Sequence, residues 1–243
     1  MARRGTGLDE RAGGRRPRRT GDFAARPGRA RAHRAFAVIR AEETGALWRL
    51  TLDRPERANA LTRAMLAELA AHLARAAAAL PKVLVLTGAG KVFSAGADLD
   101  EAAAGLATDP VWEEVSGRLA ALPCLTIAAL NGTLAGGAFG MALACDLRVG
   151  VEGARFFYPV LRNGYLPQPS DPRRLATLVG SARAKLILLG GARIEAAEAL
   201  AMGLIDRLVV RDALEATVAA LAADVLADAA GVAPAIKAML PGG

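Results

Sequence analysis

The chain has 243 residues, of which 53% are hydrophobic and 23% charged, so it holds enough apolar material to bury the core of one domain. This composition excludes collagen-like, disulfide-framework and wholly disordered proteins. The formal net charge of +7 does not indicate a nucleic-acid or membrane partner for the body of the protein, because residues 1–35 carry a net charge of +8 and the remainder carries −1.

Residues 1–35 are predicted to be a disordered, arginine-rich tail. The segment has almost no large apolar residues and no hydrophobic period, so it cannot offset its own ordering entropy. Its arginine pairs lack the following apolar run that a twin-arginine export signal needs. Two interpretations stay open, an over-extended gene start or a tether to nucleic acid or another acidic surface; for the protein as a whole, nucleic-acid binding is not expected.

The rest of the chain is expected to be soluble and cytoplasmic, without membrane contact. Its best apolar run, residues 119–130, is broken by Pro123 and falls short of the about 18 residues that a membrane span requires. Cys124 and Cys145 lie among apolar residues, which favours buried free thiols over a disulfide or a metal site.

The first unit after the tail is predicted to be a β-hairpin, a helix and a returning strand. These elements are expected at residues 36–40, 46–53, 62–80 and 82–86. The hairpin strands alternate apolar and polar residues, and the helix repeats apolar residues every three or four positions. Thr62 can cap the start of that helix.

The same pattern recurs further along the chain. Helices are predicted at residues 109–122 and 138–145, and strands at 125–130, 146–149 and 204–210. This alternation predicts an α/β fold of repeated β-β-α turns. A core over residues 36–180 and a helical C-terminal segment over 181–243 are the expected divisions.

Two segments of small residues follow buried strands, at residues 93–98 and 135–140. In the first, small side chains leave backbone N–H groups accessible; in the second, Gly136 and Gly137 begin a helix, where free N–H donors and the helix dipole favour an anion. Two converging N–H groups can form an oxyanion hole for a thioester. Either segment alone is better explained as a tight turn, but the presence of both favours the site.

Other glycine-dependent sites fit poorly. A P-loop needs Ser or Thr after its lysine, and Val92 follows Lys91; a dinucleotide fingerprint needs a sixth-position glycine, where Phe93 stands. A nucleophile elbow needs glycine two residues before the serine, where Val92 precedes Ser94. Nucleotide hydrolysis and serine-hydrolase chemistry are therefore not supported.

Four motifs together resemble a known family. They are Arg54-Pro55 with Asn59-Ala60-Leu61, Phe93 to Leu99, Asn131-Gly132 to Asp146, and Gly203-Leu204-Ile205-Asp206. In order and spacing the set is similar to the crotonase superfamily, the enoyl-CoA hydratase/isomerase family, from about residue 36 to the C-terminus. The resemblance implies a crotonase-like spiral of β-β-α repeats, a helical C-terminal oligomerisation segment, and a homotrimer or dimer of trimers.

The resemblance also implies a substrate and its binding residues. The substrate class is acyl-CoA thioesters, with coenzyme A as part of the substrate and no separate cofactor or metal. The thioester oxygen is expected on the N–H groups of Ala97 and Gly137. Further substrate-binding residues implied by the resemblance are Arg57, Ala95, Asp98, Leu99, Gly136, Val160 and Gln168. Arg57 and Lys237 are equally well interpreted as phosphate or adenine contacts, the latter across a subunit boundary, or as solvated charges.

The chain departs from the family at its catalytic positions. The two glutamates of the hydratases correspond here to Gly140 and Val160, and neither can activate water or protonate carbon. The third position that the family uses is Gln168, which cannot shuttle a proton. Asp171 is the only carboxylate in the polar stretch 158–171, and it is either an acid-base group or the N-cap of a helix from Pro172.

Glu113 and Glu114, on the helix expected over the acyl pocket, are further candidates for an acid or base, or are surface acids. The leading hypothesis is an acyl-CoA lyase or isomerase that is not a standard hydratase. Decarboxylation requires the fewest catalytic side chains, because the oxyanion hole alone can stabilise the resulting enolate. The alternative is a non-catalytic acyl-CoA-binding or scaffold subunit.

Overall fold

Parallel strand pairing organises the larger of two β-sheets. The computed structural model describes residues 38–43 and 45–240, so the predicted tail at residues 1–35 lies outside the described residues. The larger sheet has the order β1 (Ile39–Glu42), β2 (Leu47–Leu52), β3 (Val83–Gly88), β5 (Leu125–Leu130), β7 (Leu147–Val151) and β10 (Arg207–Val209). Only the β1–β2 pair within it is antiparallel, which confirms the predicted hairpin.

A second, smaller sheet is formed by strands that alternate along the chain with those of the first. Its order is β4 (Val92–Ser94), β6 (Thr133–Ala135), β8 (Arg155–Phe157) and β9 (Ile194–Glu195). The strands β4, β6 and β8 are parallel, so their carboxyl ends meet at one edge. Because β3, β5 and β7 are each followed within a few residues by a strand of this second sheet, each repeat supplies both sheets. The predicted β-β-α spiral is confirmed.

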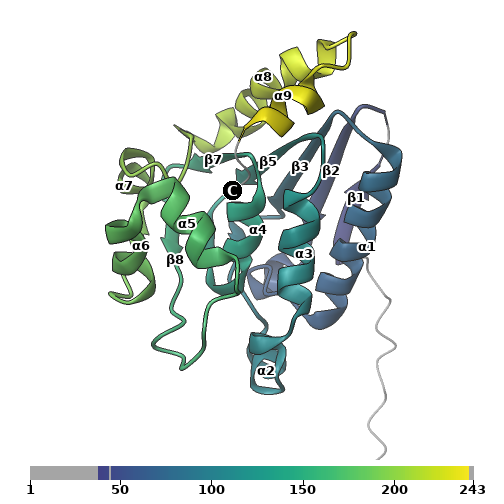
Figure 1. The fold of residues 1–243 in the computed structure, drawn as a ribbon. Coiled ribbons are helices and arrows are strands. Elements are labelled where there is room, and N and C mark those ends of the chain that lie inside the picture. Colours follow the sequence, from purple (N-terminus) through teal and green to yellow (C-terminus); the bar gives the residue numbers. More distant parts are fainter. Residues whose placement is uncertain (1–37, 44, 241–243) are drawn as a thin grey trace, which may run out of the picture. The chain divides into compact units, whose positions relative to one another are not determined.

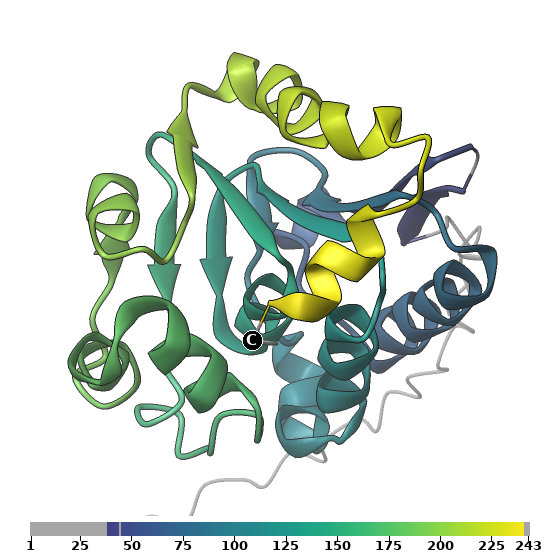
Figure 2. The ribbon, with the colours of Figure 1, turned by 45° about the horizontal axis from the view of Figure 1, so that its top comes forward.

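The helices of the spiral pack in succession, each against the next (Figure 1). They are α1 (Arg63–Ala79), α3 (Val111–Ala120), α4 (Phe139–Ala144), α5 (Asp171–Val179) and α6 (Ser181–Leu188). Shorter elements are α2 (Leu99–Ala103), α7 (Ala196–Ala201), and 3-10 turns at Pro55–Arg57, Leu106–Thr108, Gly136–Ala138 and Arg211–Ala213. The C-terminal helices α8 (Leu214–Ala227) and α9 (Ala233–Met239) pack against β5 (Figure 2).

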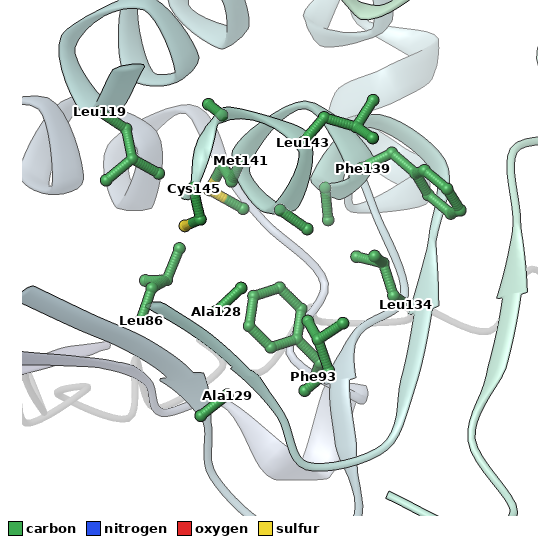
Figure 3. Close-up of a cluster of buried hydrophobic side chains, with 14 of the residues drawn as sticks. Leu86, Phe93, Leu119, Ala128, Ala129, Leu134, Phe139, Met141, Leu143 and Cys145 are labelled. Atoms are coloured by element: carbon green, nitrogen blue, oxygen red, sulfur yellow. The ribbon is translucent and has the colours of Figure 1, made fainter. Parts of the chain in front are cut away.

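Apolar side chains from both sheets and from α4 fill the core (Figure 3). Phe93 of β4 and Phe139 of α4 are fully buried, and burial of such a side chain contributes about 1.5–3 kcal/mol. Cys124 and Cys145 are buried free thiols, as predicted, and desolvation raises the pKa of Cys124 to about 11. This packing holds α4 rigidly over the sheet.

The long predicted helix is confirmed as α1, and Thr62 caps it by accepting a hydrogen bond from the Met65 N–H at 3.2 Å. None of the helices within residues 38–43 and 45–240 has the length and apolar content to cross a bilayer.

Candidate functional site

A cavity of about 140 Å³ opens at the carboxyl ends of β4, β6 and β8. Its walls come from these strand ends, from α2 and α3, and from the loop that follows β8. Seven residues predicted for the site line it: Ala95, Ala97, Leu99, Gly136, Gly137, Val160 and Gln168. The spiral therefore brings together both small-residue segments and the loop after β8, which are far apart in sequence.

Two glycines let the ends of β4 and β6 approach closely. Gly96 has φ +93° and Gly136 has φ +57°, a backbone conformation that side chains disfavour. A Cβ atom on Gly96 would lie 2.9 Å from the Ala135 carbonyl oxygen and 3.2 Å from the Gly136 Cα. The two residues that follow, Ala97 and Gly137, both line the cavity.

The backbone N–H groups of these two residues have no acceptor in the part of the chain that the structure describes. In the Gly96–Asp98 segment the flanking donors are engaged: the Gly96 N–H donates to Ser94 Oγ and the Asp98 N–H to the Leu61 carbonyl. Gly137 stands at the start of the 3-10 turn that leads into α4. Within residues 38–43 and 45–240, neither the Ala97 N–H nor the Gly137 N–H donates a hydrogen bond.

Trp112 of α3 packs over Gly137 and limits what can occupy that position. A Cβ atom on Gly137 would lie 3.2 Å from the Trp112 ring, which the hydrogen bond from Nε1 to the Leu106 carbonyl holds in place at 2.8 Å. Leu99, another lining residue, is 85% exposed and so stands at the cavity mouth. Trp112 was not predicted, because nothing in the sequence of α3 indicates which of its apolar residues faces the cavity.

Two residues predicted to bind substrate do not line the cavity. The Asp98 carboxylate accepts a hydrogen bond from Arg54 at 2.8 Å, which lowers its pKa, and it caps the start of α2. Arg57 is exposed in the turn before Asn59. Asp98 therefore has a structural role, and the substrate contacts of Asp98 and Arg57 remain predictions.

Lys237, predicted as a possible phosphate or adenine contact, is bonded within the chain. Its Nζ donates to Asp146 Oδ2 at 2.7 Å and to the Cys124 carbonyl at 2.8 Å. The asparagines of the sequence motifs are also structural: Asn59 bonds the Ala89 and Val92 carbonyls, and Asn131 bonds the Gly90 carbonyl.

Asp171 does not cap a helix, so the interpretation of this residue as an N-cap is wrong. The cap position is Ser170, and Asp171 is the first residue of α5, with its side chain turned inward and fully buried. The Tyr158 hydroxyl donates to Asp171 Oδ2 at 2.8 Å. The carboxyl lies against Gly140, where a Cβ atom would come within 2.8 Å of Asp171 Oδ1.

Burial dominates the electrostatics of this pair. Desolvation raises the pKa of Asp171 to about 7, although the Tyr158 hydrogen bond and the Arg174 charge oppose the shift. Desolvation also raises the pKa of the Tyr158 phenol far above its usual range. Tyr158 lines the cavity, so this pair reaches the same space as Ala97 and Gly137.

The two glutamates of α3 differ in their burial and in their hydrogen-bond partners. Glu113 is half-buried and its Oε2 accepts from the Ser170 N–H at 3.3 Å, while Glu114 is exposed and pairs with Arg118. Neither lines the cavity.

Comparison with known proteins agrees with this architecture. A family model described as enoyl-CoA hydratase/isomerase matches residues 42–241. A probable enoyl-CoA hydratase of Mycobacterium leprae (strain TN) is 37% identical over 170 residues, which cover 68% of this chain and 66% of that protein. A crystal structure described as an enoyl-CoA hydratase/carnithine racemase from Magnetospirillum magneticum superposes with a TM-score of 0.78 at 31% identity, covering 84% of this chain and 80% of that one.

The family model spans most of the chain, and the superposition likewise covers most of it. The chain therefore belongs to the enoyl-CoA hydratase/isomerase family of crotonase-fold proteins.

Proposed function

We propose that the protein is an enzyme that acts on acyl-CoA thioesters by stabilising an enolate, as a lyase or isomerase and not as a two-glutamate hydratase. The observation that carries the proposal is the pair of N–H groups at Ala97 and Gly137 beside one cavity, neither of which has an acceptor among the described residues. Two such donors form an oxyanion hole, and they bind the thioester oxygen most tightly when negative charge develops on it. Membership of the enoyl-CoA hydratase/isomerase family supports the thioester as substrate class.

The residues around the cavity argue against hydration. Adding water to a double bond needs one group to activate the water and another to protonate the α-carbon. Gly140 and Val160 stand where the family resemblance expects those groups. Loss of carbon dioxide from a malonyl-type thioester needs neither group at the first step, because the departing carboxylate leaves its electron pair on the enolate. Decarboxylation is therefore the favoured lyase reaction.

The size of the cavity favours a short acyl group. At about 140 Å³ it is smaller than the roughly 300–1,000 Å³ of pockets that enclose drug-sized ligands. A longer chain would have to displace Trp112 or leave through the mouth beside Leu99.

The test is turnover of malonyl-type, enoyl- and 3-oxoacyl-CoAs by the full chain. Gly137→Pro removes one N–H donor, so kcat is expected to fall about 100- to 1,000-fold. Gly137→Ala keeps the donor but presses on Trp112, and Gly117→Ala is its matched control, because a Cβ atom on Gly117 meets nothing within 4 Å.

Each negative result has a distinct meaning. Acyl-CoA binding without turnover of any thioester in the panel would favour the alternative, a non-catalytic acyl-CoA-binding subunit. Absence of acyl-CoA binding would reject the substrate class altogether.

A further inference from the structure

We infer that Tyr158 and Asp171 form a proton relay to the α-carbon of the bound acyl group, with Tyr158 as the group in the cavity and Asp171 as the positioning residue behind it. The inference rests on the proposed function, since it assigns the proton transfer at the same site.

The Tyr158 hydroxyl has two hydrogen-bond contacts among the described residues, one of them long. Its proton is directed at Asp171 Oδ2 over 2.8 Å, and its ring stacks on Phe139 with centroids 5.3 Å apart. Its other protein contact among the described residues is a long one of 3.5 Å from the Gln168 N–H. A phenol that donates its own proton away keeps lone pairs for accepting another, and Tyr158 lines the cavity.

The position of Asp171 depends on the glycine across from it. Asp171 is fully buried, and its Oδ1 has no hydrogen-bond partner within residues 38–43 and 45–240. That atom lies 2.8 Å from where a Cβ atom of Gly140 would stand. Any side chain at 140 would therefore displace the carboxyl. The family resemblance expects a catalytic glutamate at 140, so the carboxyl from α5 occupies space that this glutamate would otherwise need.

Few charged groups lie close enough to act on Asp171. On its own helix Arg174 donates to Ser170 Oγ at 2.7 Å, and from α3 Glu113 accepts from the Ser170 N–H. From the loop after β8 and from α4 the neighbours are Tyr158 and Gly140, which carry no charge at neutral pH. Desolvation by burial outweighs the effect of these neighbours on the pKa of Asp171. A carboxyl with a pKa of about 7 exchanges its proton readily at neutral pH.

In the relay, one proton leaves the α-carbon for Tyr158 as another leaves Tyr158 for Asp171. The α-carbon C–H bond breaks and its electron pair forms the enolate, whose oxygen the Ala97 and Gly137 N–H groups hold. The proton bonds to the Tyr158 oxygen, and the phenolic proton passes to Asp171 Oδ2, which becomes neutral. The reverse sequence protonates an enolate left by decarboxylation, and Asp171 is then ionised again.

The experiment follows exchange of the α-protons of butyryl-CoA in D₂O by mass spectrometry, using the full chain. Because the ionised carboxylate is needed to accept the proton, the wild-type rate is expected to rise with pH through about 7. Tyr158→Phe is expected to lower the rate about 100- to 10,000-fold with the Kd for butyryl-CoA unchanged. Asp171→Asn should lower it and remove the pH dependence.

Tyr165→Phe is the matched comparison, because it removes the other phenol of the cavity lining, which no hydrogen bond joins to Asp171; it should retain the wild-type pH profile. Circular dichroism and thermal melting check that each variant is folded. Unchanged exchange in Tyr158→Phe, an unchanged pH profile in Asp171→Asn, or binding without exchange by the wild type would overturn the relay. Failure of the wild type to bind butyryl-CoA would instead reject the proposed function.

Discussion

Asp171 is the residue at which local sequence is least informative. An aspartate followed by proline at the start of a helix is typical of an N-cap. The backbone at Ser170 is already helical, with φ −84° and ψ −19°, so Asp171 falls one position inside α5 and its side chain points toward α4. The carboxyl fits there because Gly140 of α4 has no side chain. This space depends on a residue of another helix, so no local pattern around residue 171 indicates it.

The buried carboxyl makes stability depend on pH. The pKa of Asp171 is raised from 3.8 to about 7 on folding, so in this window the folded state binds the proton more tightly than the unfolded state. This contribution to the free energy of unfolding is complete below about pH 4, falls as pH rises, and is lost above about pH 7, with a slope of at most about 1.4 kcal/mol per pH unit. Urea unfolding at about pH 5, 6, 7 and 8 should show this decline in the wild type and not in Asp171→Asn. Parallel curves for the two proteins would contradict it.

At the scale of elements, the decisive contact joins the end of β4 to the end of β6. Both strands are three residues long, too short for an alternation pattern to be recognised, and the smaller sheet was accordingly not predicted. Strands β2, β3 and β5 of the larger sheet were predicted because each carries a run of six mostly buried residues. The small-residue segments were identified from sequence, whereas their meeting at Gly96 and Gly136 follows from the register of β4 on β6.

Two glycine-to-alanine substitutions distinguish the effect of this close contact on stability from the effect of backbone strain. Gly96 and Gly105 both have positive φ, +93° and +107°, so alanine is strained at either position by about 1–3 kcal/mol. A Cβ atom on Gly105 meets nothing within 4 Å, but on Gly96 it would lie 2.9 Å from the Ala135 carbonyl oxygen. Chemical denaturation should show Gly96→Ala to be less stable than Gly105→Ala by about 1–3 kcal/mol. Equal losses of stability would mean that the ends of β4 and β6 can move apart at no cost in free energy.

At the scale of the whole described unit, residues distant in sequence close the spiral. Lys237 of α9 bonds Asp146, which also accepts from the Thr126 N–H and hydroxyl at 2.8 and 2.9 Å. The C-terminal helix is thus attached to the beginning of β5 and to the residue before β7. The oligomerisation role predicted for residues 181–243 remains a prediction.

Removing this attachment is expected to loosen α9 alone. Lys237→Met deletes two hydrogen bonds, so amide hydrogen exchange in residues 233–240 should become faster by about tenfold, while α1 and the larger sheet keep their protection. Lys185→Met is the control, because Lys185 is exposed and its side chain has no hydrogen bond among the described residues. Equal exchange in both variants would show that apolar packing by itself holds α9.

The N–H groups of Ala97 and Gly137 beside the cavity belong to the main chain, and this limits how mutation can change the site. Point substitutions exchange side chains and, proline apart, leave every backbone donor in place. Lining residues such as Val160 and Gln168 are therefore open to replacement, whereas Gly96 and Gly136 are not. Descendants of this chain could alter which bond is broken in a substrate while retaining the means to hold it.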